Sequence, residues 1–182
     1  MIFYHKEVLI LQMGGTIDKD YPKTTGGRAF EVGEPSVRRV MARLRPSRSV
    51  ITSLHTVCRK DSLDLTEDDR QALATKVSEA SQTRVVVTHG TDFLIDTATH
   101  LATHLRHRGV TSKTVVFTGA HTPEKFRDSD ADFNIGVAIG AVQAAGPGVF
   151  VAMNGILLPW DRVERDDTGQ FVPRRRQLPV TV

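Results

Sequence analysis

Apolar runs and amphipathic segments alternate along this chain, at the spacing of strands and helices that follow one another. The apolar runs, such as residues 8–11 and 85–87, are continuous in Val, Leu and Ile instead of alternating with polar residues. Such runs are typical of strands that are buried on both faces of a parallel sheet. We expect strands at residues 8–13, 49–58, 84–88, 114–118 and 149–153.

Helices are expected between these strands, at residues 35–44, 67–81, 94–107 and from about 133 to 145. Pro35 suits a first helical position, and Thr66 with Asp69 three residues later resembles a capping box. Gly109 is placed to close the third helix. The alternation predicts an α/β fold: a doubly wound parallel sheet of Rossmann or flavodoxin type, a three-layer sandwich with helices on both faces.

Two segments fall outside this alternation. Residues 18–33 form a long loop rich in Gly and Thr, and loops of this length are often lids or binding loops. We interpret it as a mobile lid that carries Tyr21 over a ligand crevice, the alternative being a surface loop with an incidental tyrosine. Residues 154–182 are expected to form a hairpin around Asp167-Thr168-Gly169 and then a tail rich in Pro and Arg.

The composition is ordinary for a globular protein. With 182 residues, 40% hydrophobic and 25% charged, the chain is predicted to form one domain over residues 1–182. The net charge is +3, but acids and bases are interspersed and no nucleic-acid-binding module is recognisable. No apolar run reaches the length of a membrane span, and polar residues 5–7 interrupt any signal-peptide core. We therefore expect a cytoplasmic protein without nucleic-acid or membrane partners.

The single cysteine, Cys58, excludes an internal disulfide and a multi-thiolate metal site. Arg59 and Lys60 would lower the pKa of a catalytic thiol there, whereas a half-buried structural thiol is the commoner case. Of the seven histidines, His100 and His104 share a helix face but lack a third ligand. We expect no metal and no cofactor.

Two Gly-Thr turns carry the strongest chemical signal. The turn Gly14-Gly15-Thr16 follows the first strand, and Gly90-Thr91-Asp92 follows the third. Open α/β sheets bind ligands at the carboxyl ends of their strands, and glycine lets a ligand approach the backbone closely. Two hydroxyls and a carboxylate at one crevice suggest nucleophilic chemistry on a small polar molecule. Each turn by itself also fits a tight turn with a capping residue.

Five segments together resemble the bacterial-type L-asparaginase family. They stand in the family's order between residue 8 and about residue 165, so the resemblance covers nearly the whole chain. The segments are Met13-Gly14-Gly15-Thr16-Ile17, Lys60-Asp61-Ser62, Thr88-His89-Gly90-Thr91-Asp92, the run from Val116 to Asn134 that includes Asp130, and Val151-Ala152-Met153-Asn154.

The resemblance implies hydrolysis of the side-chain amide of L-asparagine through an acyl-enzyme. Thr16 would be the nucleophile, and Tyr21 on the lid would help to activate it, because a threonine hydroxyl is a poor nucleophile at its own pKa. Thr91 would activate a second nucleophile or the water on the opposite side. Backbone N–H groups around Gly15 and Thr91 would stabilise the oxyanion.

The same resemblance implies the groups that hold the substrate. Ser62, beside Asp61, would bind the α-carboxylate of the amino acid. Asp92 would pair with its α-ammonium, and Gly15 and Thr91 would line the site. His89 and His121 are left out of the catalytic set.

Two departures from the family pattern affect these expectations. The family has a lysine that completes a triad with Thr91 and Asp92, and this position falls near Arg165 here, with Arg162 close by. Arginine stays protonated, so it orients and stabilises charge but does not act as a base. The chain also resembles short, single-domain members that lack the C-terminal domain. An open crevice of this kind predicts weak substrate binding unless a second subunit closes it, so we expect a homodimer or higher homo-oligomer.

Three functions remain open from the sequence. The first is an L-asparaginase, with or without some glutaminase activity. A non-catalytic sensor that binds aspartate or asparagine on the same scaffold is the second. A nucleotide-binding α/β domain is the third, and the absence of phosphate-binding glycine motifs disfavours it.

Overall fold

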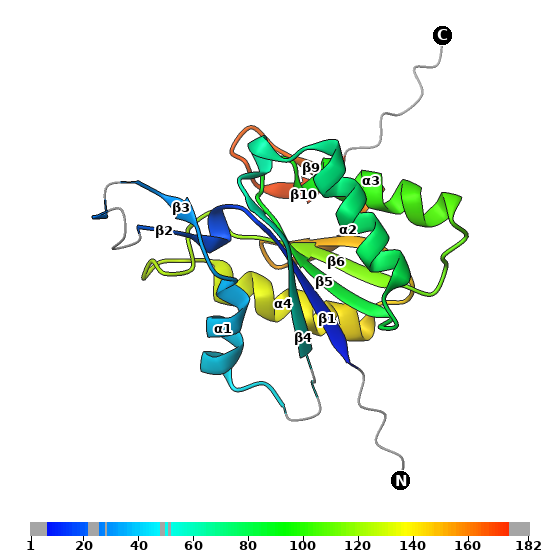
Figure 1. The fold of residues 1–182 in the computed structure, drawn as a ribbon, viewed down its shortest axis with the longest axis horizontal. Coiled ribbons are helices and arrows are strands. Elements are labelled where there is room, and N and C mark those ends of the chain that lie inside the picture. Colours follow the sequence, from blue (N-terminus) through cyan, green and yellow to red (C-terminus); the bar gives the residue numbers. More distant parts are fainter. Residues whose placement is uncertain (1–6, 22–25, 28, 48–49, 51, 175–182) are drawn as a thin grey trace.

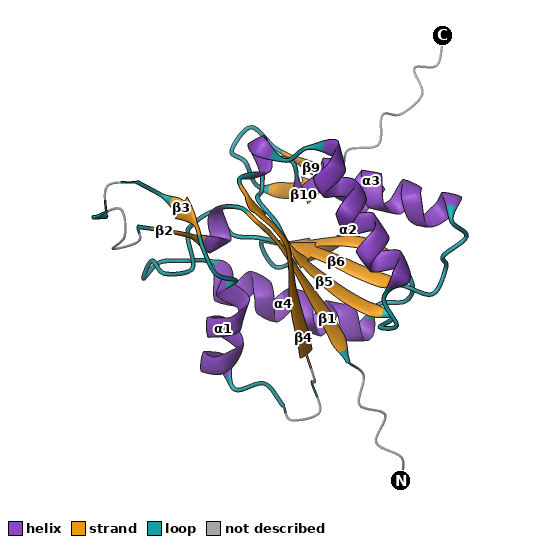
Figure 2. Cartoon of the chain, viewed as in Figure 1, coloured by secondary structure: helices purple, strands orange, loops and turns teal. Residues whose placement is uncertain are grey.

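A six-stranded sheet forms the centre of the molecule (Figures 1 and 2). The computed structural model describes residues 7–21, 26–27, 29–47, 50 and 52–174. All neighbouring strands are parallel except the last pair, β7 and β8, which is antiparallel. In spatial order the strands are β4 (Thr52–Lys60), β1 (Val8–Gly14), β5 (Arg84–Thr88), β6 (Thr114–Thr118), β7 (Gly148–Met153) and β8 (Ile156–Pro159). The predicted doubly wound α/β fold is confirmed.

Two helices cover each face of the sheet, as Figure 1 shows. Leu9 and Leu11 of β1 pack toward α2 (Glu67–Glu79) and α3 (Leu94–His107). Val8 and Ile10 alternate with them and pack toward α1 (Ser36–Leu44) and α4 (Ala131–Ala144). Because side chains alternate across a strand, a run with both faces covered must be apolar throughout. This is why β1 has no polar positions before Gln12.

The predicted element boundaries agree with the structure to within a few residues. The three elements β5, β6 and α3 have the expected bounds. The capping box at the start of α2 is also confirmed: the Thr66 hydroxyl accepts from the Asp69 N–H (3.3 Å), and the Asp69 carboxylate accepts from the Thr66 N–H (2.8 Å). The start expected for the second strand, at residue 49, lies outside the described residues.

The sequence interpretation missed β8, which was assigned to the C-terminal hairpin and tail. The strand begins after the turn Asn154-Gly155, where both residues have positive φ (53° and 82°). This is the Asn-Gly signal of a two-residue hairpin, with an apolar run on each side. The signal was present in the sequence, so the strand was predictable.

The expected C-terminal hairpin is present. It consists of β9 (Val163–Arg165) and β10 (Phe171–Pro173), which pair antiparallel after a short 3₁₀ turn, η4 (Trp160–Arg162). Val163 and Phe171 are buried in the same core as α2 and α3. The hairpin therefore packs on the sheet instead of extending from it. The tail expected after it, residues 175–182, lies outside the described residues.

The long loop after β1 has structure of its own. It begins with a 3₁₀ turn, η1 (Thr16–Asp18), and its two arms, β2 (Lys19–Asp20) and β3 (Glu31–Val32), pair antiparallel. Figure 1 shows this hairpin projecting to one side of the sheet. Residues 22–25 and 28, which belong to the expected lid, lie outside the described residues. None of the helices in the described ranges has the length and apolar character that crossing a bilayer requires.

Candidate active site

The two Gly-Thr turns touch each other at the carboxyl edge of the sheet. Gly15 lies so close to Gly90 that a Cβ atom on Gly15 would overlap the Cα and N atoms of Gly90. This contact lies between β1 and β5. The strand that follows β1 in the sheet, β4, lies on one side of β1, and β5 and the later strands lie on the other side. In open α/β sheets the ligand crevice forms at this switch point. The sequence placed both turns at this edge, and the structure brings them into contact.

Ser62 and Gly119 complete the same packing. A Cβ on Gly90 would come within 2.6 Å of the Ser62 Oγ, and one on Gly119 would come within 2.5 Å of the His89 carbonyl oxygen. The same added Cβ on Gly119 would lie 3.7 Å from the Thr91 methyl group. The turns after β1, β5 and β6 thus pack closely at glycines, and the Ser62 side chain after β4 packs directly on Gly90. This brings Thr16, Ser62 and Thr91 to one place.

A buried polar network fixes the turn that carries Thr16. The Gln12 side chain donates to the Asp18 carboxylate (2.8 Å), and the other oxygen of Asp18 accepts from the Ser36 N–H (2.7 Å) at the start of α1. The Asp18 N–H in turn donates to the Gly15 carbonyl (3.1 Å). Burial raises the pKa of Asp18 and outweighs these hydrogen bonds. The sequence interpretation missed Gln12 and Asp18, although a polar residue inside an apolar strand is a signal for such a network.

The hydroxyls of Thr16 and Thr91 make no hydrogen bond to another group in the described part of the chain. Thr16 is half-buried, and Thr91 is only 7% exposed. Both hydroxyls are therefore available to a ligand or to water. Two such hydroxyls at one edge of the sheet can attack and position a carbonyl carbon.

The Gly15 N–H is not available as an oxyanion donor in this arrangement. It donates to the Lys60 carbonyl (2.8 Å), which joins the β1 turn to the end of β4. Gly15 itself adopts φ 87° and ψ −174°, a region that is essentially restricted to glycine. The expectation that Gly15 supplies this donor is corrected: its role here is to allow close packing.

Ser62 and Asp61 lie directly after β4 and differ in their surroundings. The Ser62 hydroxyl is buried and has no hydrogen-bond partner among the described residues. Asp61 forms an ion pair with Lys19 of β2 and accepts from the Leu63 N–H (3.2 Å). Burial opposes ionisation of Asp61, but these hydrogen bonds outweigh it and lower the pKa. Ser62 is thus free to bind a ligand, while Asp61 holds the base of the β2–β3 hairpin.

Arg165 reaches Asp92 from the C-terminal hairpin. Its Nη1 donates to the Asp92 Oδ1 (2.7 Å), and its Nε donates to the Gly169 carbonyl (3.2 Å). The guanidinium also lies 5.8 Å from the centre of the Phe171 ring. Arg162, the neighbouring candidate, instead accepts at its carbonyl from the Arg174 N–H (2.9 Å). The arginine that meets Asp92 is therefore Arg165.

Two asparagine side chains connect the β9–β10 hairpin to the loop after β6. Asn134 of α4 donates to the Gly119 carbonyl (3.0 Å) and to Asp130 (2.8 Å), and its oxygen accepts from the Asn154 N–H (3.1 Å). The Asn154 side chain then accepts from the Phe171 N–H (3.3 Å). The sequence interpretation used Asp130, Asn134 and Asn154 only as motif positions. Their positioning role came from the structure.

Tyr21 does not meet Thr16 in this structure. Its ring stacks on Phe30 with the centroids 3.9 Å apart, and it is 45% exposed. Phe30 in turn approaches Phe126, at 6.1 Å between centroids. Tyr21 thus belongs to an exposed aromatic cluster on the β2–β3 hairpin.

Cys58 is a structural thiol. Its Sγ donates to the Met13 carbonyl (3.1 Å), and its side chain is partly buried against the core. Burial raises the pKa of the thiol to about 11, with a further contribution from Asp69, and the opposing effect of Lys60 is smaller. A neutral thiol is a poor nucleophile. These contacts favour the half-buried structural thiol that the sequence analysis gave as the commoner case.

The described ranges contain no group of three or more His, Cys, Asp or Glu side chains that could hold a metal ion. Hydroxyls, carboxylates and a guanidinium lie at this edge of the sheet.

His89 is buried and neutral beneath the site. Its Nδ1–H donates to the Gly90 carbonyl (2.7 Å), and its Nε2 has no partner among the described residues. Burial lowers the pKa of His89 from 6.5 to about 4. Between these values the unfolded chain binds a proton that the folded chain does not. Stability is therefore highest above pH 6.5 and is lost as the pH falls toward 4.

We expect this histidine to remove about 2 kcal/mol of unfolding free energy between pH 7 and pH 5. Urea unfolding at the two pH values, compared with the variant His89→Gln, measures the contribution. The variant should lose most of this pH dependence, while His107→Gln, at an exposed histidine, should keep it. Equal pH dependence in His89→Gln and in the unsubstituted chain would contradict the prediction.

Comparisons with known proteins point to one family. The family model described as "Asparaginase, N-terminal" matches residues 7–172. An L-asparaginase of Thermococcus kodakarensis is 27% identical over 161 residues, which cover 87% of this chain and 47% of that protein.

Solved structures show the same fold. The thermostable L-asparaginase from Thermococcus kodakarensis has a TM-score of 0.76 at 22% identity and is matched over 92% of this chain and 51% of its own. A probable cytoplasmic L-asparaginase from Campylobacter jejuni gives 0.76 at 24% identity, with 92% and 51% coverage. L-asparaginase I from Vibrio cholerae gives 0.71 at 22% identity, with 96% and 52% coverage. This chain therefore spans about half the length of the relatives that it matches.

Proposed function

Because this chain belongs to the asparaginase family, through the N-terminal domain that its residues 7–172 match, we propose that it hydrolyses L-asparagine to L-aspartate and ammonia. The observation that carries the proposal is the contact of the two Gly-Thr turns. The close approach of Gly15 and Gly90 gathers two free threonine hydroxyls and the unpartnered Ser62 hydroxyl at the switch point of the sheet. The relatives described above are L-asparaginases, which supports L-asparagine as the substrate.

In the proposed reaction Thr16 is the nucleophile. Its Oγ forms a bond to the side-chain amide carbon of asparagine, the C–N bond breaks, and the hydroxyl proton leaves with the nitrogen as ammonia. Water then attacks the resulting β-aspartyl ester, which releases aspartate and restores the hydroxyl. A base must accept the Thr16 proton in the first step. Tyr21, next to β2 on the hairpin that follows Thr16, is the proposed group.

A hydroxyl would hold the α-carboxylate of the substrate, and a carboxylate would hold its α-ammonium. The orphan Ser62 hydroxyl supports binding of the α-carboxylate, since buried polar groups are rarely left without a partner. Asp92 has one oxygen paired with Arg165, which leaves the other for the α-ammonium. Arg165 would orient Asp92 but would not act as a base. Thr91 would hold the water for the second step.

The experiment that tests the proposal is release of ammonia from L-asparagine. We expect Thr16→Ala to lower kcat by about a thousandfold or more, since the nucleophile is removed. The matched control is Thr111→Ala, at an exposed threonine in the loop between α3 and β6. Turnover that survives in Thr16→Ala, or that is lost equally in both variants, would contradict the assignment of Thr16.

The Arg165–Asp92 pair supports a second candidate, a sensor that binds aspartate or asparagine without turnover. A permanently protonated arginine fills the place of the family's lysine, so one half of the reaction lacks a base. Aspartate would then raise the melting temperature, because a ligand that binds only the folded state stabilises it. Thermal stabilisation without ammonia release would favour the sensor, and ammonia release would favour the enzyme.

A cytoplasmic location is also proposed, and the name of the Campylobacter jejuni protein supports it.

A further inference from the structure

The second half of the proposed reaction needs a base that the groups assigned so far do not supply. Water must lose a proton when it attacks the ester on Thr16, and Thr91 is the hydroxyl proposed to hold that water. Arg165 cannot accept the proton, because a guanidinium stays protonated. Asp92 has one oxygen bound to Arg165 (2.7 Å), and its other oxygen is assigned to the α-ammonium of the substrate. The base must therefore be another group at this edge of the sheet.

Three other titratable side chains at this edge are already engaged. Asp61 is paired with Lys19, and Asp130 accepts hydrogen bonds from three residues. His89 is buried, and burial lowers its pKa to about 4, so its imidazole is a weak base. Among the residues that the structure describes at this edge, the other histidine is His121, which is exposed.

His121 lies on the loop that passes beside Thr91. Its backbone N–H donates to both oxygens of Asp130 (3.0 and 3.1 Å), which fixes the chain at this residue. Two residues earlier, a Cβ added to Gly119 would lie only 3.7 Å from the Thr91 methyl group. The loop after β6 therefore brings His121 to the Thr91 side of the site.

The C-terminal hairpin approaches the same histidine from the other direction. The ring of His121 lies 6.2 Å from the ring of Phe171, measured between centroids. The Arg165 guanidinium lies 5.8 Å from the centre of that same Phe171 ring, and it binds Asp92, the residue after Thr91. Both routes through the structure, along the loop and through the hairpin, thus connect His121 with Thr91. Its ring nitrogens make no hydrogen bond within the described ranges, so they are free to bind water.

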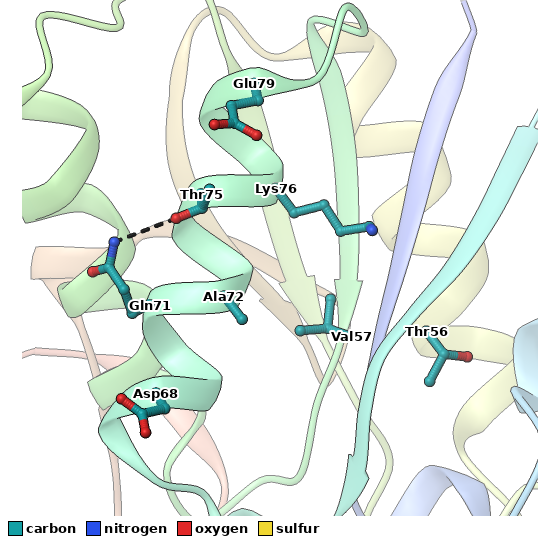
Figure 3. A pocket seen from close by; sticks show the side chains of 8 residues that line it. All are labelled: Thr56, Val57, Asp68, Gln71, Ala72, Thr75, Lys76 and Glu79. Atoms are coloured by element: carbon teal, nitrogen blue, oxygen red, sulfur yellow. Dashed lines mark hydrogen bonds between the residues drawn. The ribbon is translucent and has the colours of Figure 1, made fainter.

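The groove of about 560 Å³ between β4 and α2 does not supply the base. Figure 3 shows Lys76 on its wall, together with Asp68 and Glu79 of the same helix. The groove lies beside the outermost strand of the sheet, and β1 separates that strand from β5, which Thr91 follows. Lys76 is therefore far from the proposed water.

We propose that His121 is the general base of the second step, an inference that rests on the proposed function. The water oxygen forms a bond to the ester carbon while one water proton passes to a ring nitrogen of His121. The bond from that carbon to the Thr16 Oγ then breaks, the imidazolium returns the proton to this oxygen, and aspartate leaves. Imidazole suits this task because it takes up and releases a proton near neutral pH.

Steady-state ammonia release from L-asparagine by His121→Gln tests the proposal. We expect kcat to fall about a hundredfold or more, because the ester on Thr16 is hydrolysed slowly. KM should fall by a similar factor, so that kcat/KM changes less than about threefold, since the first step does not use His121. Intact mass measured during turnover should then show one aspartyl group on the chain. His107→Gln, at an exposed histidine of α3, is the matched control and should keep the original kcat.

The pH dependence of kcat gives a second readout. Between pH 8 and pH 6 the kcat of the unsubstituted chain should fall as the imidazole becomes protonated, whereas the kcat of His121→Gln should stay level. The charged groups around the ring are Asp130 in the same loop and Arg165 across Phe171, and carboxyl and guanidinium groups ordinarily titrate outside this range.

The outcomes separate this inference from the proposed function. An unchanged kcat in His121→Gln, a kcat/KM that falls as much as kcat, or an equal pH dependence in the two proteins would overturn the role of His121 while ammonia release by the unsubstituted chain still supported the enzyme. No ammonia release by the unsubstituted chain would overturn both. Circular dichroism checks that the variants are folded.

Discussion

A methyl group on Gly15 is expected to lower the unfolding free energy by about 4 kcal/mol, among the largest effects of a single substitution. Gly15 has φ 87° and ψ −174°, where a side chain is strained, and the new Cβ would overlap the backbone of Gly90. Backbone atoms cannot turn aside as a flexible side chain can. The ends of β1 and β5 would have to separate, and Thr16 would move away from Thr91.

Urea unfolding of Gly15→Ala measures this loss. The matched control is Gly140→Ala on the exposed face of α4, where a Cβ meets nothing within 4 Å. There the substitution should stabilise the protein by about 0.5–1 kcal/mol, because alanine favours the helix. A loss below about 1 kcal/mol in Gly15→Ala would show that the two strand ends separate easily and that the close contact is unimportant.

Removal of the Asn134 amide is expected to lower the unfolding free energy by about 3 kcal/mol. The side chain is fully buried and bonds to Gly119, Asp130 and Asn154. Alanine would leave the buried Gly119 carbonyl unsatisfied, which carries a desolvation cost, and would remove the hydrogen bonds to the half-buried Asp130 and to the N–H of Asn154. The loop after β6 and the turn after β7 would lose their common support. The hairpin that holds Arg165 against Asp92 would then be less firmly placed.

Chemical unfolding of Asn134→Ala is compared with Gln143→Ala in the same helix. The Gln143 amide makes one hydrogen bond, to the Ile139 carbonyl (2.7 Å), whereas the Asn134 amide makes three, and Gln143 is exposed. Its loss should change stability by no more than about 0.5 kcal/mol. Equal losses of unfolding free energy in the two variants would show that the hydrogen bonds of Asn134 do not contribute the expected stability.

Much of the fold was predictable because the pattern of β1, β5 and β6 leaves little choice. A short apolar run in Val, Ile and Leu has to be buried on both faces, and its ends are fixed by polar residues and glycine. The positions of the Gly-Thr turns followed from the same argument. Their actual contact did not, since it depends on the order of strands in the sheet and on the absence of side chains at Gly15 and Gly90.

The parts that sequence reasoning missed depend on long-range contacts or on overlooked local signals. Asn154-Gly155 is a local hairpin signal, and β8 follows from it directly. The bond from Gln12 to Asp18 and the chain through Asn134 join segments whose proximity the sequence does not reveal. Arg165 is an intermediate case: its position relative to Asn154 gave a candidate, but only the register of β9 and β10 brings it to Asp92. The assumed oxyanion donor at Gly15 failed because its N–H already binds Lys60.

The central position of β1 has a consequence for how the chain folds. Among the strands of the sheet, β1 is synthesised before its neighbours β4 and β5, and the pairing with β5 joins Val8 to Arg84. Its apolar residues stay without a partner until both neighbours have been made, which fits the slow folding of parallel sheets. Refolding from denaturant should therefore be prone to aggregation at high concentration, and nascent chains that stop before residue 88 should bind chaperones that recognise exposed apolar segments.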